Sequence, residues 1–290
     1  MYRSMLFVPG DNEKKIAKSE QVRPDAVILD LEDAVAPANK AAARKLVASY
    51  LKATRGNRRA ALFVRINPLS TPEALDDLAA VMAEAPDGIV QPKAASPLEV
   101  QRLAHYLDAL EAQHGLPRGA TRIVPVATEV PEALFALGGY SQVGERLAGI
   151  TWGAEDLAAA IGAISNKGDD GYWSEPYALA RSLCLFAASA AKVAAIDTLY
   201  ADFRDGPGLA AASRRARRDG FGGKIAIHPA QVEVINEAFT PSDDEVAHAN
   251  RVIELFRANP GVGTLGLDGQ MLDMPHLVQA QKIVALSARA

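Results

Sequence analysis

Residues 149–162, GITWGAEDLAAAIG, decide how the rest of the chain is interpreted. The apolar run 150–152 predicts a buried strand, which ends at Gly153 in a turn that carries Glu155 and Asp156 ahead of a predicted helix. Parallel α/β proteins bind ligands at the carboxyl ends of their strands, and a glycine there lets a ligand approach the backbone. The alternative is that one of these two acids only caps the helix.

The same arrangement recurs along the whole chain. Short apolar runs alternate with longer stretches of helical periodicity. Helices are expected at 40–53, 71–85, 97–114, 132–137 and 177–191, and eight strands at 5–8, 26–31, 61–66, 88–91, 122–127, 149–152, 194–200 and 224–227. This order predicts an α/β fold, a (β/α)₈ TIM-like barrel with helices outside the strands. An open doubly wound sheet is the alternative fold. It is less well supported, because no G-x-G-x-x-G motif opens a helix after the first strand.

The chain continues beyond the eighth unit. Helices are expected at 245–258 and from about Pro275 to Arg289, with a glycine-rich loop at 259–270 between them. We therefore predict a catalytic barrel domain at residues 1–240 and a C-terminal helical arm at 241–290. The loop is interpreted either as a lid or as a flexible connection to a packing helix.

Composition narrows the function classes. The 290 residues are 49% hydrophobic and 23% charged, which is typical of a globular enzyme. A net charge of −4 argues against a general nucleic-acid role, and no membrane span is expected. The N-terminus resembles neither a signal nor a transit peptide, so a cytoplasmic location is expected. The lone Cys184 lies in an apolar helical run, where a buried small hydrophobe is favoured over a nucleophile.

Polar side chains follow each predicted strand. On a barrel they would converge on one face, and carboxylates from several strands would repel one another unless a cation lay between them. A hard divalent ion, best Mg²⁺, satisfies this requirement, whereas the five histidines form no zinc-like cluster. The residues are Asp11, Asn12, Lys14, Asp30, Glu32, Asp33, Arg65, Asn67, Lys93, Glu129, Glu155, Asp156, Asp197, Asp202, Asp205 and His228.

Two of the cations have competing interpretations. Arg65 could hold a substrate carboxylate by two parallel hydrogen bonds, or form a salt bridge to Asp30 or Glu32. Lys93 could be the Schiff-base lysine of a metal-free aldolase. A structural or phosphate-contacting role is favoured for Lys93, because several acids can reach it.

Eight motifs in series resemble one known family. They cover nearly the whole chain in the family's order and together are similar to the CitE-like branch of the HpcH/HpaI aldolase and citrate lyase superfamily. That branch comprises the citrate lyase β subunit and free-standing malyl-CoA, citramalyl-CoA and related CoA-ester lyases. The resemblance implies a TIM-like barrel assembled as a homotrimer or a multiple of it. The motifs are LFVPGDN (6–12), DAVILDLEDAVAP (25–37), FVRINP (63–68), VQPKA (90–94), TEVPEAL (128–134), ITWGAEDLAAAIG (150–162), GFGGKIAIHPAQVEVINEAF (220–239) and DGQMLDMPH (268–276).

The resemblance also implies roles for individual residues. Glu129 and Asp156 would hold Mg²⁺, and Arg65 would grip the carboxylate of a 2-oxo acid. Glu32 and Asp33 match acids that would hold metal-bound waters. Asp273 matches an acid that relatives deliver on a lid from a neighbouring subunit.

Contacts with coenzyme A are implied at Phe7 and Lys18. The chain departs from the family at Asn12, where relatives often carry arginine. It departs again at 128–131, TEVP, where many relatives read I-E-T-A or I-E-T-P.

The expected activity is reversible carbon–carbon cleavage of a β-hydroxyacyl-CoA, such as citramalyl-CoA, malyl-CoA or citryl-CoA. The products would be acetyl-CoA or another acyl-CoA and a 2-oxo acid, with Asp273 exchanging a proton with the thioester enolate. The alternatives are a citrate lyase β subunit acting on an acyl-carrier-protein thioester within a complex, a CoA-independent metal aldolase, a malyl-CoA thioesterase, and an inactive binding scaffold.

Overall fold

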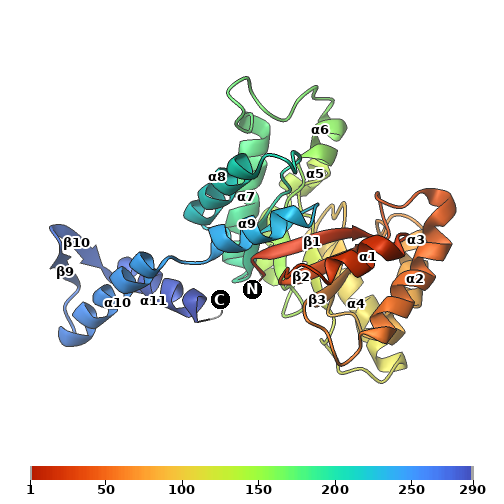
Figure 1. The fold of residues 1–290 in the computed structure, drawn as a ribbon, viewed down its shortest axis with the longest axis horizontal. Helices are drawn as coiled ribbons and strands as arrows, with labels where there is room; N and C mark the ends of the chain where they lie inside the picture. Colours follow the sequence, from red (N-terminus) through yellow and green to blue (C-terminus); the bar gives the residue numbers. More distant parts are fainter. Residues whose placement is uncertain (1, 289–290) are drawn as a thin grey trace. The chain divides into compact units, whose positions relative to one another are not determined.

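An eight-stranded parallel sheet forms the centre of the molecule's first compact unit, which ends at Asn236 (Figure 1). The structure is a computed structural model that describes residues 2–288. The strands run in the order β5-β4-β3-β2-β1-β8-β7-β6. They are β1 (Ser4–Pro9), β2 (Ala26–Asp30), β3 (Ala61–Arg65), β4 (Gly88–Gln91), β5 (Arg122–Pro125), β6 (Gly149–Thr151), β7 (Ala194–Asp197) and β8 (Gly223–Ala226).

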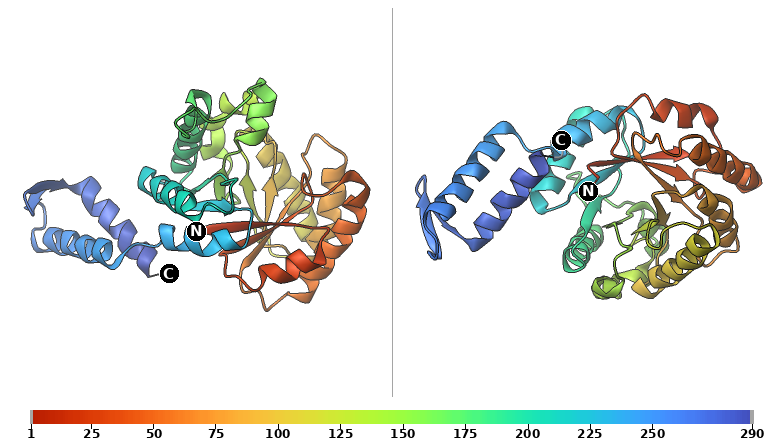
Figure 2. Two further views of the ribbon diagram at one scale, coloured as in Figure 1. Left: turned by 45° about the horizontal axis from the view of Figure 1, so that its top comes forward. Right: turned by 90° about the horizontal axis from the view of Figure 1, so that it is seen from below.

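The sheet curls until its two edge strands meet. Parallel bridges join Ile123 to Leu147 and Val126 to Thr151, and the Ala127 backbone N–H donates to the Thr151 carbonyl at 2.9 Å. The strands therefore form a near-closed barrel, with helices outside it in both views of Figure 2. The predicted TIM-like barrel is confirmed.

The helices follow the strands as the periodicity predicted. In α2, for example, Ala43, Val47 and Leu51 lie four residues apart and are all buried. The predicted helix at 132–137 is shorter than expected, because two glycines at 138–139 disfavour an α-helix and the chain tightens into a 3₁₀ turn. The helices that begin in this unit are α1 (Glu13–Ser19), α2 (Lys40–Ala53), α3 (Glu73–Val81), α4 (Pro97–Gln113), α5 (Pro131–Leu134), α6 (Glu155–Ile161), α7 (Glu175–Ala190), α8 (Gly206–Asp219) and α9 (Ala230–Phe239), with 3₁₀ turns η1 (Pro37–Asn39), η2 (Met82–Glu84) and η3 (Leu137–Gln142). The last three residues of α9 belong to the second unit.

Apolar side chains fill the inside of the barrel. Phe63 takes the space beside Gly88, where an added Cβ would lie 2.1 Å from the ring. This cluster fills the barrel, so it leaves no channel through the middle, and a ligand at the carboxyl ends of the strands meets only its upper layer. Its buried members are Met5, Ala26, Ile28, Phe63, Val90, Val124, Val126, Ile196 and Ile225.

The second compact unit begins at Glu237. It contains α10 (Asp243–Ala258) and α11 (Met274–Ser287), which pack together around Val252, Phe256 and Leu272. The expectation of a loop throughout 259–270 was wrong, because β9 (Thr264–Leu267) and β10 (Gln270–Asp273) form an antiparallel hairpin. Asp268 and Gly269 both have positive φ, at 51° and 78°, as a two-residue Asp-Gly hairpin turn requires. No helix within residues 2–288 is long and apolar enough to cross a membrane.

Candidate active site

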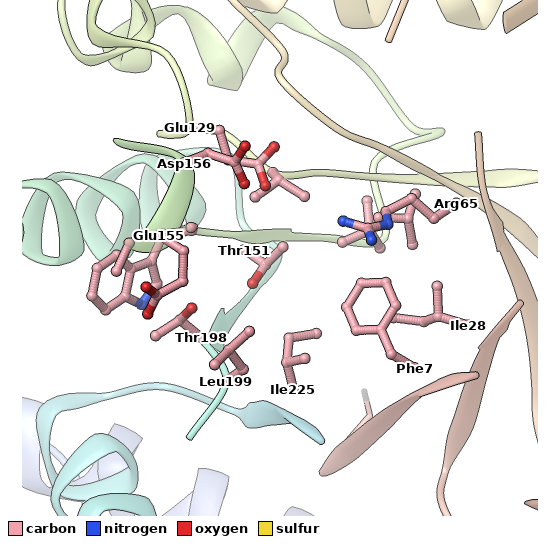
Figure 3. Close-up of a pocket in the computed structure, with 16 residues that line it drawn as sticks. Phe7, Ile28, Arg65, Glu129, Thr151, Glu155, Asp156, Thr198, Leu199 and Ile225 are labelled. Atoms are coloured by element: carbon pink, nitrogen blue, oxygen red, sulfur yellow. The ribbon is translucent and has the colours of Figure 1, made fainter. Parts of the chain in front are cut away.

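A pocket of about 560 Å³, including its open mouth, lies among the carboxyl ends of the strands. Figure 3 shows the acids Glu129 and Asp156 on one side of it and Arg65 with Phe7 on the other. Strands β1 and β3, the segment after β5 and the start of α6 therefore bring these residues together at one end of the barrel.

Glu129 and Asp156 face each other (Figure 3). Glu129 is 5% exposed, and its Oε2 accepts a hydrogen bond of 2.6 Å from the backbone N–H of Lys93. Burial raises the pKa of Glu129 to about 8; the Lys93 hydrogen bond opposes this rise, and the negative charge of Asp156 adds to it. A second carboxylate beside a buried one is costly unless a cation is shared between them.

Gly153 makes room for the Glu129 side chain. A Cβ at this position would lie 2.6 Å from Glu129 Cγ, closer than any real side chain tolerates. The Thr128 hydroxyl holds the same turn by accepting a hydrogen bond of 3.1 Å from the Gly153 N–H. The glycine of the GAED turn is thus explained by packing against Glu129.

The two adjacent acids of this turn have different surroundings. Glu155 Oε1 accepts a hydrogen bond of 2.9 Å from the Asn166 side chain, whereas Asp156 Oδ1 lies 3.2 Å from Lys93 Nζ. The N-cap of α6 is Ala154, so neither acid occupies the capping position. Asp156 is therefore the acid of this pair that faces Glu129.

This donor set fits a hard divalent cation. Mg²⁺ typically takes one or two protein carboxylates and completes its octahedron with water and substrate oxygens. Within residues 2–288 no group of three or more His, Cys, Asp or Glu side chains could hold a metal ion. The protein would thus contribute two ligands, Glu129 and Asp156.

Arg65 is held rigidly at the opposite wall. Its Nε and Nη2 donate to the two oxygens of Asp30 at 2.8 and 2.6 Å, and Nη1 lies 2.8 Å from Glu32 Oε2. The guanidinium carbon lies 4.6 Å from the centre of the Phe7 ring. Burial lowers the pKa of Arg65, but the bonds to Asp30 and the charge of Glu32 outweigh this and raise it.

Both interpretations of Arg65 are compatible with this geometry. A guanidinium has five N–H donors; two of them bond to Asp30, and Nη1 is ion-paired with Glu32, whose Oε2 accepts no hydrogen bond within residues 2–288. One N–H on each terminal nitrogen remains for a carboxylate in the pocket. The ion pairs are observed, and substrate binding stays a prediction.

Lys93 is surrounded by acids. Its Nζ lies 2.5 Å from Glu32, 3.1 Å from Asp33 and 3.2 Å from Asp156. Burial lowers the pKa of Lys93, but its partners, Glu32 foremost, raise it above the ordinary value. A Schiff-base lysine must be neutral to attack a carbonyl. The geometry therefore disfavours that role.

Sequence reasoning named Asn67 but missed the two residues that support it, Lys40 and Asp77. Lys40 Nζ donates to the carbonyls of Leu31 and Glu32 and, at 2.6 Å, to Asn67 Oδ1, which anchors the turn after β2. Asn67 in turn donates to the fully buried Asp77 from both its backbone and side-chain nitrogens, each at 2.7 Å. The one available signal was Asp77 itself, a charged residue on the apolar face of a predicted helix.

The acids after β7 do not join the pocket, contrary to the expectation. Asp197 is buried and accepts hydrogen bonds from Trp152 Nε1 and Lys224 Nζ, each at 2.8 Å. Successive strand residues alternate between the two faces, and Ile196 belongs to the barrel interior, so Asp197 faces the helices. Asp205 caps α8 by accepting a hydrogen bond of 2.9 Å from the Gly208 N–H.

The other predicted residues are placed as follows. Glu32 is buried between Arg65 and Lys93, while the side chain of Asp33 is 60% exposed. Lys18 lies exposed in the last turn of α1, outside the residues that line the pocket. Asp273 belongs to the second unit, at the N-cap of α11, where its Oδ1 lies 2.6 Å from His276 Nδ1. Contacts of Phe7 and Lys18 with coenzyme A stay predictions.

The methyl group of Gly153→Ala should displace Glu129, so a Mg²⁺ ion held by this carboxylate would bind about tenfold more weakly. Isothermal titration calorimetry measures this directly. The matched control is Gly138→Ala, where an added Cβ meets nothing within 4 Å. Equal Mg²⁺ affinities in the two variants would contradict the packing argument.

Comparison with known proteins supports this picture. Residues 3–229 match the family model of the HpcH/HpaI aldolase/citrate lyase. The chain is 35% identical to a mitochondrial citramalyl-CoA lyase of Rattus norvegicus, over 98% of this chain and 86% of the relative. It is 34% identical to a (3S)-malyl-CoA thioesterase of Cereibacter sphaeroides, over 98% and 94%.

A solved structure is similar over nearly the full length. CitE from Mycobacterium tuberculosis, in complex with magnesium, acetoacetate and coenzyme A, superposes with a TM-score of 0.80. The two sequences are 33% identical, and the match covers 99% of this chain and 98% of that one. Sequence and structure agree that this chain belongs to the HpcH/HpaI aldolase/citrate lyase family and is one of its carbon–carbon lyases.

Proposed function

We propose that the chain cleaves a β-hydroxyacyl-CoA, such as citramalyl-CoA, malyl-CoA or citryl-CoA, reversibly into an acyl-CoA and a 2-oxo acid. The observation that carries the proposal is the pair of facing carboxylates, Glu129 and Asp156, opposite the fixed Arg65. We propose Mg²⁺ as the ion held by that pair. When bound, it supplies a Lewis acid that stabilises negative charge on a substrate oxygen.

Arg65 would bind the carboxylate of the oxo-acid half. Asp30 and Phe7 hold its guanidinium in place, so little side-chain entropy is lost when the two remaining N–H groups meet the substrate. The raised pKa of Arg65 keeps it charged throughout the cycle. Arg65 therefore orients the substrate and balances its charge.

Cleavage requires two proton movements. The hydroxyl proton must leave as the carbon–carbon bond breaks, and Glu32 and Asp33 are the candidate bases beside the pocket. The bonding electrons pass to the acyl carbon as a thioester enolate, which must be protonated at carbon. We propose that Asp273, delivered by the second unit of a neighbouring copy in a homotrimer, returns that proton.

The test is cleavage of citramalyl-CoA by the purified chain, with and without EDTA and with Mg²⁺ added back. We expect pyruvate and acetyl-CoA in equal amounts, lost with EDTA and restored by Mg²⁺. Activity that persists after exhaustive chelation would rule out the metal mechanism. Release of free citramalate and CoA would instead support the thioesterase alternative.

Two further comparisons separate the remaining alternatives. Free citramalate in place of its CoA ester tests the CoA-independent aldolase. A thioester on an acyl-carrier protein, cleaved where the CoA ester is not, would identify a citrate lyase β subunit that needs its complex.

Mg²⁺ affinity should rise with pH and level off near pH 8. Glu129 has a pKa raised to about 8, so at lower pH the ion must displace a proton, and the association constant should gain about tenfold per pH unit. Because the folded pKa lies above the unfolded one, the metal-free fold should lose stability as pH rises from about 5 to about 8. Calorimetry and Tm across this range test both trends, and Glu129→Gln should flatten them.

A further inference from the structure

The side chains that line the pocket include more negative than positive charges. Three carboxylates, Glu129, Glu155 and Asp156, face it, and Arg65 is the one cation among the lining side chains of the described chain. Two of its five donors bond to Asp30, and its Nη1 is ion-paired with Glu32. Lys93 lies beside the pocket but is ion-paired with Glu32, Asp33 and Asp156, so Arg65 and the proposed metal ion are left to balance one substrate carboxylate.

The remaining wall is mostly apolar. It is built from interior residues of the four strands β2, β4, β5 and β8, together with one residue directly after β5 and one after β7. Such a wall favours hydrogen or methyl and disfavours a desolvated carboxylate. The residues are Ile28, Val90, Val124, Val126, Leu199 and Ile225.

Thr151 and Thr198 add side-chain hydroxyls to this lining, and Thr151 is the more informative of the two. It ends β6, lines the pocket and is 3% exposed, yet its hydroxyl has no hydrogen-bond partner within residues 2–288. Buried hydroxyls in folded proteins are nearly always hydrogen-bonded, so a ligand or an ordered water is needed here. Figure 3 shows Thr151 between the carboxylate pair and Phe7, at the centre of the lining residues.

Resting on the proposed function, we infer that the pocket selects a 2-oxo acid with a single carboxylate and a hydrogen or methyl group on its carbonyl carbon, and that the Thr151 hydroxyl hydrogen-bonds an oxygen of that acid. Glyoxylate and pyruvate fit this description. Oxaloacetate does not, because its second carboxylate would face the apolar wall. Malyl-CoA and citramalyl-CoA are then the favoured esters, and citryl-CoA is excluded.

The first test compares kcat/KM for citramalyl-CoA, malyl-CoA and citryl-CoA with the purified chain and Mg²⁺. We expect citryl-CoA to be at least about a hundredfold poorer than the better of the other two. Citryl-CoA cleaved within tenfold of that ester would overturn the inference and leave the proposed lyase function intact. Cleavage of no ester would instead count against the proposed function.

Product binding gives a readout that does not depend on turnover. In the presence of Mg²⁺, calorimetry should show pyruvate or glyoxylate binding at least about tenfold more tightly than oxaloacetate. Oxaloacetate binding as tightly as pyruvate would refute the single-carboxylate pocket.

Two substitutions test Thr151 itself. Thr151→Val keeps the shape but removes the hydroxyl, and should lower kcat/KM for the preferred ester by about tenfold with Mg²⁺ affinity unchanged. Thr151→Ser keeps the hydroxyl and should stay within about threefold of the original chain. A valine variant with full activity, or a serine variant as poor as valine, would exclude the hydrogen bond.

Discussion

Glu129→Gln is expected to lower kcat/KM for thioester cleavage by about a thousandfold or more, because the buried carboxylate proposed to hold Mg²⁺ becomes a neutral amide. Glutamine has the same shape, and its side-chain oxygen can still accept the hydrogen bond from the Lys93 N–H. The fold should therefore survive. Steady-state kinetics and Mg²⁺ titration measure the loss.

The Tm of Glu129→Gln shows whether activity is lost through weaker metal binding or through unfolding. Burial raises the pKa of Glu129, so the ionised acid destabilises the metal-free fold, and removing it should leave Tm at pH 8 equal or higher. The matched control is Glu132→Gln, an exposed residue three positions along the same segment. Near-normal activity of Glu129→Gln, or an equally large loss of activity in Glu132→Gln, would contradict the proposal that Glu129 holds the metal ion.

Arg65→Met should reduce the free energy of unfolding by about 3–5 kcal/mol, because removing one partner of a buried ion pair leaves the other charge uncompensated. Asp30 is 1% exposed, and both of its oxygens bond to Arg65. The substitution therefore leaves the Asp30 carboxylate buried without its counter-charge. Glu32 retains Lys93 at 2.5 Å. Urea unfolding measures this change.

Activity and stability can be separated at this position by a double variant. Asp30→Asn removes the stranded charge, so Arg65→Met with Asp30→Asn should recover most of the lost stability. It should not recover activity, because the donors for the substrate carboxylate are still missing. A double variant that regains both would show that Arg65 serves only the fold.

The barrel and the family could be predicted because both are indicated by short stretches of sequence and by their order along the chain. Each strand is a short apolar run beside a helical stretch, and eight ordered motifs identify the family. The hairpin at 264–273 was missed although Asp268 and Gly269 form a strong turn signal, because glycines elsewhere in the segment obscured it. The metal, CoA and proton-transfer roles stay predictions for the experiments above.

Sequence alone determined that polar residues follow the strands and would gather at one end of a barrel, because hydrophobic periodicity is set by neighbours along the chain. Only the tertiary structure decided which of these residues face the pocket. Asp197 was expected there, but it accepts a hydrogen bond from Lys224 on the outer face of the barrel strands. Side chains alternate between the two faces of a strand, so a shift of one residue reverses their direction. The pairing of Arg65 with Asp30 and the gap that Gly153 leaves for Glu129 join residues more than twenty positions apart, and only folding brings them into contact.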